Sequence, residues 1–166
     1  LRGLQKTDKV VVTQSSQAYS GSSAARIETL DTKGGKVFFV IKIPKITTGT
    51  LFIGSFKNPI DMSNTLTNTL FGESCDKKPL KVKGFYKYTP GPMFYRSSAE
   101  NYHEFKEEPT TTDECAINVI LYDITDDDTY ITGVNTYNDS RIIAKAMLAD
   151  GTAKANYTEF SLPLVY

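Results

Sequence analysis

The chain has 166 residues and carries 19 basic and 19 acidic side chains, so its net charge is zero. This length suits one domain with a real hydrophobic core, and we expect residues 1–166 to form a single domain. The balanced charge argues against a nucleic-acid partner, and no apolar run is long enough to span a bilayer. Tyr, Phe, Thr and Val are plentiful, which favours β-sheet over helix.

The first third of the chain predicts short strands separated by polar turns. Four segments have the apolar or alternating pattern of a strand: Val10–Thr13, Ala24–Leu30, Val37–Ile43 and Thr50–Phe56. Val37–Ile43 is almost entirely apolar, which is typical of a strand covered on both faces. In the last segment Gly54 stands between two phenylalanines on one face, and this indicates a bulge or a close approach of another backbone.

Leu80–Gly91, with the sequence LKVKGFYKYTPG, predicts a strand that covers the core on one side only. Alternate positions from Leu80 to Tyr88 are apolar or aromatic, and the positions between them carry lysines. Phe85 breaks this pattern because it stands on the lysine face. The interpretation is therefore that either a second layer covers Phe85 or a ligand binds there.

The second half of the chain continues in the same style. Cys115–Asp123 predicts a half-open strand with Ile117, Val119 and Leu121 toward the core. Asp150-Gly151 between two apolar runs is a strong hairpin signal, which predicts strands over Arg141–Leu148 and Tyr157–Leu164.

Two long polar segments, Asn58–Lys78 and Tyr95–Thr112, are predicted as loops. The sum is eight or nine strands and no segment that demands a helix. We therefore predict an all-β fold, a two-sheet antiparallel β-sandwich of jelly-roll type.

Signals for enzymes, metals and cofactors are weak in this sequence. The chain has one histidine, His103, and two cysteines, Cys75 and Cys115, so a Cys/His metal site cannot be completed. The cysteines are more simply two half-buried thiols than a disulfide, a question that the sequence leaves open. We expect no cofactor and no metal. A Ca²⁺ ion near Asp126–Asp128 stays open, although aspartates are also ordinary turn residues.

Aromatic side chains on the predicted outward faces are more informative. Phe85 and Tyr122, with Tyr130 and Tyr137 as further candidates, would stand on sheet surface near Lys87 and other polar residues. Sugars present apolar C–H faces to a flat ring and hydroxyls to polar groups, so this pattern is typical of a carbohydrate site. The alternative is that these rings pack under the two long polar segments and form a second, minor core.

Several segments together resemble the putative carbohydrate metabolism domain (PCMD) family. The resemblance rests on Gly49–Phe56, Leu70–Gly72 with Lys78-Pro79, Leu80–Gly91, and Asp113–Ile117 with Leu121–Asp123. Ala24–Leu30 also fits, so the similarity spans roughly residues 24–166. The segment GFYKYTPG is the most specific part.

The resemblance implies a jelly-roll domain similar to carbohydrate-binding modules, on exported or surface lipoproteins of glycan-using bacteria. Such domains often follow an immunoglobulin-like domain, which is then an expected neighbour in a longer protein. Members are sometimes labelled putative glycoside hydrolases, but no catalytic motif of the family maps here, and no catalytic residue is assigned. Family members continue beyond the Pro-x-x-Tyr ending at Pro163–Tyr166, so we expect one or two further strands outside this sequence.

The resulting hypothesis is that the domain takes part in glycan utilisation by recognising an oligo- or polysaccharide without cleaving it. We expect it in the periplasm or at the cell surface, and we expect no transmembrane segment within this chain. Six residues are the candidate ligand contacts. Three would stack on sugar rings and three would hydrogen-bond hydroxyls: Phe85, Tyr122 and Tyr102, then Arg96, Asn118 and Lys87.

Two other functions stay open from the sequence. One is a structural or adhesive sandwich that binds a protein partner at an open edge. The other is a glycoside hydrolase, whose two carboxylates would come from Asp113, Glu114, Asp123 and Asp126–Asp128.

Overall fold

A computed structural model describes residues 10–32, 35–37, 41–43, 45–61, 63–97, 105–124 and 129–166. These residues form fourteen strands and one short 3₁₀ helix, η2 (Thr65–Asn68), and no α-helix. The prediction of an all-β fold is confirmed. The strands pair in seven sheets of two strands each, so the sheets are smaller than those of the predicted sandwich. The described residues include no helix with the length and apolar character of a membrane span.

The chain divides into two compact units, each made from two separate segments of sequence. The first unit holds residues 1–51 and 88–115. Its four antiparallel ladders are β1 (Val12–Ser15) with β2 (Ala24–Ile27), β3 (Leu30–Asp31) with β6 (Ile46–Thr47), β4 (Gly35–Val37) with β5 (Ile41–Ile43), and β10 (Phe94–Arg96) with β11 (Lys106–Glu108). The predicted single domain is not tested by this division and stays a prediction.

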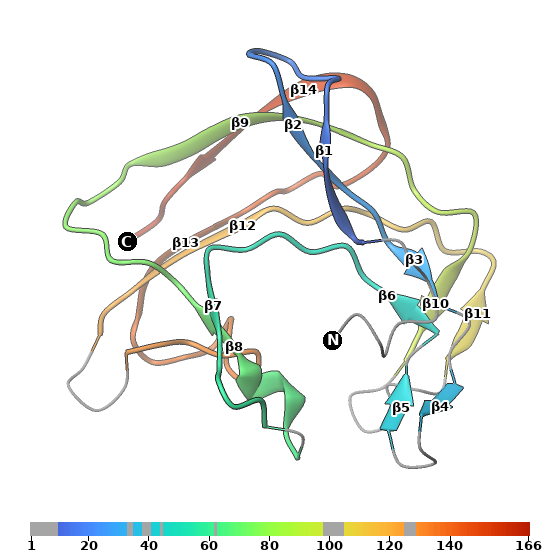
Figure 1. Ribbon diagram of the computed structural model, residues 1–166. Coiled ribbons are helices and arrows are strands. Elements are labelled where there is room, and N and C mark those ends of the chain that lie inside the picture. The colour runs from blue at the N-terminus through green and yellow to red at the C-terminus, as the bar shows by residue number, and fades with distance from the viewer. Residues whose placement is uncertain are drawn as a thin grey trace. The chain divides into compact units, whose positions relative to one another are not determined.

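The second unit holds residues 52–87 and 116–166. Its three ladders are β7 (Gly54–Phe56) with β8 (Thr69–Phe71), β12 (Asn118–Tyr122) with β13 (Ile142–Met147), and β9 (Lys81–Tyr88) with β14 (Lys154–Pro163). Figure 1 shows β9 beside β14, although about seventy residues of sequence separate them. The contacts of these two strands progress in opposite chain directions, from Leu80–Leu164 to Lys83–Glu159, as in an antiparallel pair.

The core of the second unit lies between β13 and β14. Ala144 and Ala146 of β13 are buried with Leu162 of β14 and with Leu164. The apolar face of β12 packs on this cluster through the three residues predicted to face the core, Ile117, Val119 and Leu121. Alternate positions of β13 are buried and exposed because side chains in a strand point to opposite faces. The outward positions Ile143, Lys145 and Met147 therefore form a surface.

Strand β9 confirms the predicted alternation and corrects one of its residues. Its burial alternates along all eight positions, with Lys81, Lys83, Phe85 and Lys87 exposed. Tyr86 on the inner face packs edge-on against Phe160, with ring centroids 6.1 Å apart. Leu80 was predicted on the core face, but it is 78% exposed because the strand begins one residue later.

Two further predictions are wrong for the same physical reason, a strand partner that local sequence does not reveal. The single strand over Val37–Ile43 is instead the antiparallel pair β4–β5, whose ladder joins Val37 to Ile41. The Asp150-Gly151 turn does not close a hairpin ladder, because β13 pairs with β12 and β14 pairs with β9. Only a single bridge, Lys145 with Val165, links β13 to the chain after β14 among the described residues.

Neither cysteine forms a disulfide, and Cys75 is exposed while Cys115 is half-buried. The expectation of half-buried thiols therefore holds for Cys115 and is wrong for Cys75. Residues 98–104 and 125–128, which include Tyr102, His103 and Asp126–Asp128, lie outside the described residues.

Candidate functional site

A surface depression of about 270 Å³ lies on the outward side of β13 in the second unit. This volume is close to the lower limit of the roughly 300–1,000 Å³ typical of small-molecule sites. Its walls combine aromatic, amide, charged and aliphatic side chains, among them Tyr137, Asn138, Asp139, Ile143, Lys145 and Val165. Such a mixture offers both an apolar surface and hydrogen-bonding groups to a ligand.

Tyr137 supplies the aromatic wall, and its side chain is about half exposed, at 52%. It belongs to the turn over residues 133–138, which precedes β13. Asn118 of β12 donates a hydrogen bond from Nδ2 to the Tyr137 hydroxyl at 2.9 Å. The ring is thus held at its polar end while about half of the residue stays exposed, as a stacking platform requires.

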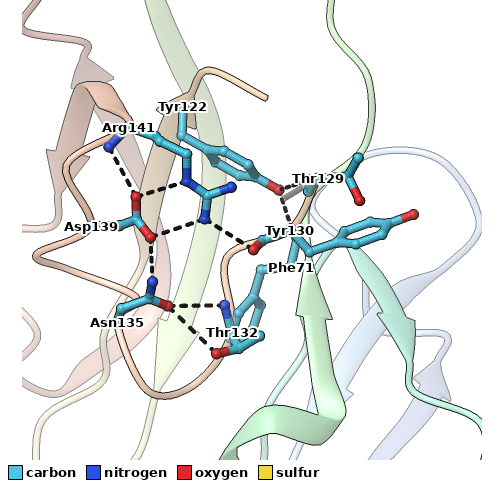
Figure 2. A network of polar contacts seen from close by, with 8 residues as sticks. All are labelled: Phe71, Tyr122, Thr129, Tyr130, Thr132, Asn135, Asp139 and Arg141. Atoms are coloured by element: carbon cyan, nitrogen blue, oxygen red, sulfur yellow. Dashed lines mark hydrogen bonds and ion pairs between the residues drawn. The ribbon is translucent and has the colours of Figure 1, made fainter. Parts of the chain in front are cut away.

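A polar network holds this turn in place (Figure 2). Arg141 donates from Nε to Asp139 Oδ1 and from Nη2 to Asp139 Oδ2, both at 2.9 Å. Asn135 also donates to the Asp139 carboxylate, and its own carbonyl oxygen accepts from the Thr132 backbone N–H at 3.2 Å. Arg141 reaches on to the Tyr130 carbonyl oxygen at 3.1 Å. These bonds join both ends of the turn to the start of β13 and pre-organise the wall that carries Tyr137.

The Arg141–Asp139 pair is shielded from solvent, since the two side chains are only 12% and 7% exposed. The hydrogen bonds from the Arg141 side chain and backbone lower the pKa of Asp139 to about 2. Asp139 therefore stays ionised at neutral pH and cannot serve as a proton donor. Among the described residues that line the depression, it is the only carboxylate.

Tyr122, a predicted stacking residue, serves a structural role in this unit. Its hydroxyl donates to the Phe71 carbonyl oxygen, and Arg141 lies over its ring at 5.6 Å from the centroid. A Cβ atom on Gly72 would overlap the Tyr122 hydroxyl, so only glycine fits beside the ring. Figure 2 shows the Tyr122 ring with its hydroxyl turned toward Phe71. Tyr122 therefore contacts the Asn58–Lys78 segment, as in the alternative interpretation in which the aromatic rings pack under the long polar segments.

Phe85 and Lys87 lie on the exposed face of β9, as the alternation predicted. Phe85 is 41% exposed. Lys87 places its ammonium 5.3 Å from the centroid of the Tyr157 ring, a cation–π contact with the neighbouring strand β14. These two residues form a second surface of the same unit, which we call the β9 face.

The remaining predicted contacts divide between the units. Arg96 lies on β10 in the first unit, where its Nε donates to Glu108 at 2.9 Å across the ladder to β11. Asn118 lies in the second unit and touches the depression through Tyr137. Tyr102 falls outside the described residues. Of the six predicted residues, Asn118 is thus the one that the structure joins to the depression.

Sequence reasoning missed Asn138 and Lys145 and named Tyr137 only as a further candidate. The alternation in β13 was a usable signal, because it places Lys145 on the outward face between Ile143 and Met147. The turn over residues 133–138 has no periodic pattern, so its contribution could not be found in the same way.

Metal binding has no support from the described residues, which contain no cluster of three or more His, Cys, Asp or Glu side chains able to hold an ion.

Of the carboxylates considered for hydrolysis, Asp113 accepts a hydrogen bond from the Tyr88 hydroxyl at 3.0 Å. Desolvation and this bond raise the pKa of Tyr88 to about 12. Asp126–Asp128, the acidic turn considered for Ca²⁺, lie outside the described part of the chain.

The chain is similar to proteins of known structure. Two of them are crystal structures described as putative glycoside hydrolases, one from Bacteroides thetaiotaomicron VPI-5482 and one from Bacteroides vulgatus ATCC 8482. The first is 27% identical with a TM-score of 0.79, and the match covers 98% of this chain and 45% of that one. The second is 27% identical with a TM-score of 0.73, and covers 94% and 58%.

The chain therefore spans about half the length of these solved relatives. No curated protein matches the chain. The family described as Putative carbohydrate metabolism domain matches residues 2–166, which confirms the resemblance drawn from the sequence motifs. This chain is a member of the PCMD family, a domain family related to carbohydrate metabolism.

Proposed function

We propose that this domain recognises a carbohydrate without cleaving it, and that the depression on β13 is its binding site. The observation that carries the proposal is the half-exposed Tyr137 ring, fixed by Asn118, in a depression that Asn138 and Lys145 also line. The ring would take the C–H face of a sugar, and the amide and ammonium would take its hydroxyls. Membership in the PCMD family supports a saccharide as the ligand.

The state of Asp139 supports recognition rather than hydrolysis at this place. Glycoside hydrolysis ordinarily needs two carboxyl groups, one of which is protonated and acts as the acid. Here the carboxylate in the lining is bound by Arg141 and has a lowered pKa. Its role in the proposal is to hold the Tyr137 turn.

The expected affinity is weak, since an open and hydrated contact gains little beyond the desolvation of its polar groups. The β9 face, with Phe85 and Lys87, is the second proposed contact surface. It presents an aromatic side chain and an ammonium on outward positions of the same strand.

A glycan array followed by calorimetry tests the proposal. We expect binding to one glycan class, and Tyr137→Ala should weaken it by about tenfold, which corresponds to ~1.4 kcal/mol of binding free energy. Tyr130→Ala is the matched control, because Tyr130 is a 40% exposed tyrosine of the same loop that contributes its backbone carbonyl to the network.

Phe85→Ala separates the two surfaces in the same experiment. Binding lost with Phe85→Ala and kept with Tyr137→Ala would move the site to the β9 face. The absence of binding across plant, host and microbial glycans would refute the function itself.

Glycoside hydrolase activity is the second candidate function, because both solved relatives carry that name. The relevant assay is release of reducing sugar from the glycans that bind. We expect no release by this chain alone; release that is lost with Asp113→Asn or Asp123→Asn would establish an enzyme instead.

For location, we propose an exported protein of the periplasm or outer cell surface, with a lipid anchor and a neighbouring immunoglobulin-like domain in the full-length protein. The support is the family resemblance alone. Cell fractionation of the native host, with detection by a specific antibody, is the test, and a wholly cytoplasmic signal would contradict it.

A further inference from the structure

The two charged residues of the depression differ in whether other protein groups neutralise them. Two charged residues line it, Asp139 and Lys145. Asp139 is fully engaged, because Arg141 holds both carboxylate oxygens and Asn135 donates to one of them. A ligand therefore meets this carboxylate as one half of a neutral pair, and the remaining charge of the lining is the positive charge of Lys145.

The strand positions next to Lys145 are apolar. Along β13 the outward positions before and after it are Ile143 and Met147. Across the ladder its partner on β12 is Ile120, and its backbone forms a bridge with Val165. Among the described residues no ion pair with the Lys145 ammonium occurs, although six other ion pairs do. Lys145 thus lines the same depression as Tyr137, and no carboxylate of the described residues forms an ion pair with its ammonium.

We infer that the depression prefers an acidic saccharide, one that carries a carboxylate or a sulfate group, over a neutral one. This inference rests on the proposed function and adds the ligand class to it. Lys145 would pair with the anionic group while Tyr137 takes the apolar face of the ring that bears it. Hydrogen bonds between an ammonium and an anion are shorter and stronger than those to a neutral hydroxyl.

The expected preference is modest, because the pair would form at a surface in contact with water. Exposed ion pairs contribute little, and the corresponding gain in affinity is roughly two- to fivefold. The gain should shrink as salt is added, since screening acts strongly on exposed charges.

Matched glycan pairs test the inference by calorimetry on the full chain. One arm compares an oligogalacturonate with its methyl-esterified form, and the other compares a sulfated oligosaccharide with its desulfated form. We expect the acidic member of at least one pair to bind roughly two- to fivefold more tightly at low salt. The arm that shows the preference identifies carboxylate or sulfate as the recognised group.

Lys145→Gln should reduce the acidic-to-neutral ratio to about one, because glutamine can hydrogen-bond a hydroxyl but carries no charge to pair with an anion. Lys145→Arg should retain the ratio. Lys81→Gln is the matched control, a lysine on the exposed face of β9 in the same unit, and should change nothing.

Neutral glycans that bind as tightly as acidic ones to the unaltered protein would overturn the inference and leave the proposed function intact. An acidic preference that survives Lys145→Gln would also overturn it. Binding of no glycan at all would refute the proposed function.

Discussion

Gly72→Ala offers the sharpest test of how the second unit is assembled, because two penalties meet at this residue. The backbone at Gly72 has φ +113°, a conformation that side chains other than glycine rarely adopt. The new Cβ would also overlap the Tyr122 hydroxyl and stand 3.1 Å from two carbons of its ring. Tyr122 would have to move, and its hydrogen bond to the Phe71 carbonyl would break.

The magnitude follows from adding the two penalties. The backbone conformation costs about 1–2 kcal/mol, and a lost hydrogen bond costs about 0.5–1.5 kcal/mol. The expected loss in the free energy of unfolding is therefore about 1.5–3.5 kcal/mol, or roughly 3–14 °C in Tm for a chain of this size. Urea denaturation followed by circular dichroism and tyrosine fluorescence measures it, since the chain has no tryptophan.

Gly21→Ala is the matched control. Gly21 also has a positive φ, +71°, but no atom lies within 4 Å of the position of its Cβ. This variant should show the backbone penalty alone. In a Tyr122→Phe background, Gly72→Ala should cost less, because the most severe overlap is with the hydroxyl. Equal losses for Gly72→Ala and Gly21→Ala, together with strict additivity with Tyr122→Phe, would refute the described packing.

Three further predictions test the core and the two perturbed groups. Leu162→Ala should lower the free energy of unfolding by about 2–5 kcal/mol, because Leu162 is buried and only 5% exposed. Val165→Ala should lower it far less, because Val165 is 73% exposed. Denaturation in urea measures both losses. The lowered pKa of Asp139 stabilises the fold above the ordinary value of 3.8, and this contribution is lost as pH falls toward about 2; Asp139→Asn should flatten the pH profile of Tm in that window, and an unchanged profile would contradict the pairing. Tyr88 should ionise near pH 12 in an ultraviolet titration, so stability should fall as pH rises from 10 toward 12; Asp113→Asn should bring the pKa of Tyr88 down, and no change would contradict their contact.

Close packing explains several residues in the segments that resemble the PCMD family. Gly54, Gly72 and Tyr122 come from three of these segments and meet in the second unit. A Cβ on Gly54 would overlap the Leu70 carbonyl oxygen, which confirms the predicted close backbone approach. The Gly72 N–H donates to the Ile53 carbonyl at 2.9 Å, and the Tyr122 hydroxyl donates to Phe71. Shared motifs of this kind identify the fold and do not by themselves locate a ligand.

Sequence periodicity determined the local features of this protein. The alternation from Lys81 to Tyr88 gave β9 and the exposure of Phe85, because a strand turns successive side chains to opposite faces whatever its partner is. The same rule gave the core-facing residues of β12, whereas the strand over Arg141–Leu148 was predicted from the Asp150-Gly151 signal. The strand-forming composition and the family motifs were likewise sufficient for the all-β class and for the family.

Only the tertiary structure decided which strands pair and which side chains share a surface. Strand β14 pairs with the distant β9, so the Asp150-Gly151 turn signal did not decide its partner. A shift of register between Leu121 and Tyr122 changes the pairing with β13 at the end of β12, where Tyr122 reaches the Phe71 backbone. The depression joins a turn without periodicity to the outward face of β13. Such juxtapositions depend on long-range pairing, which a pattern of period two cannot specify.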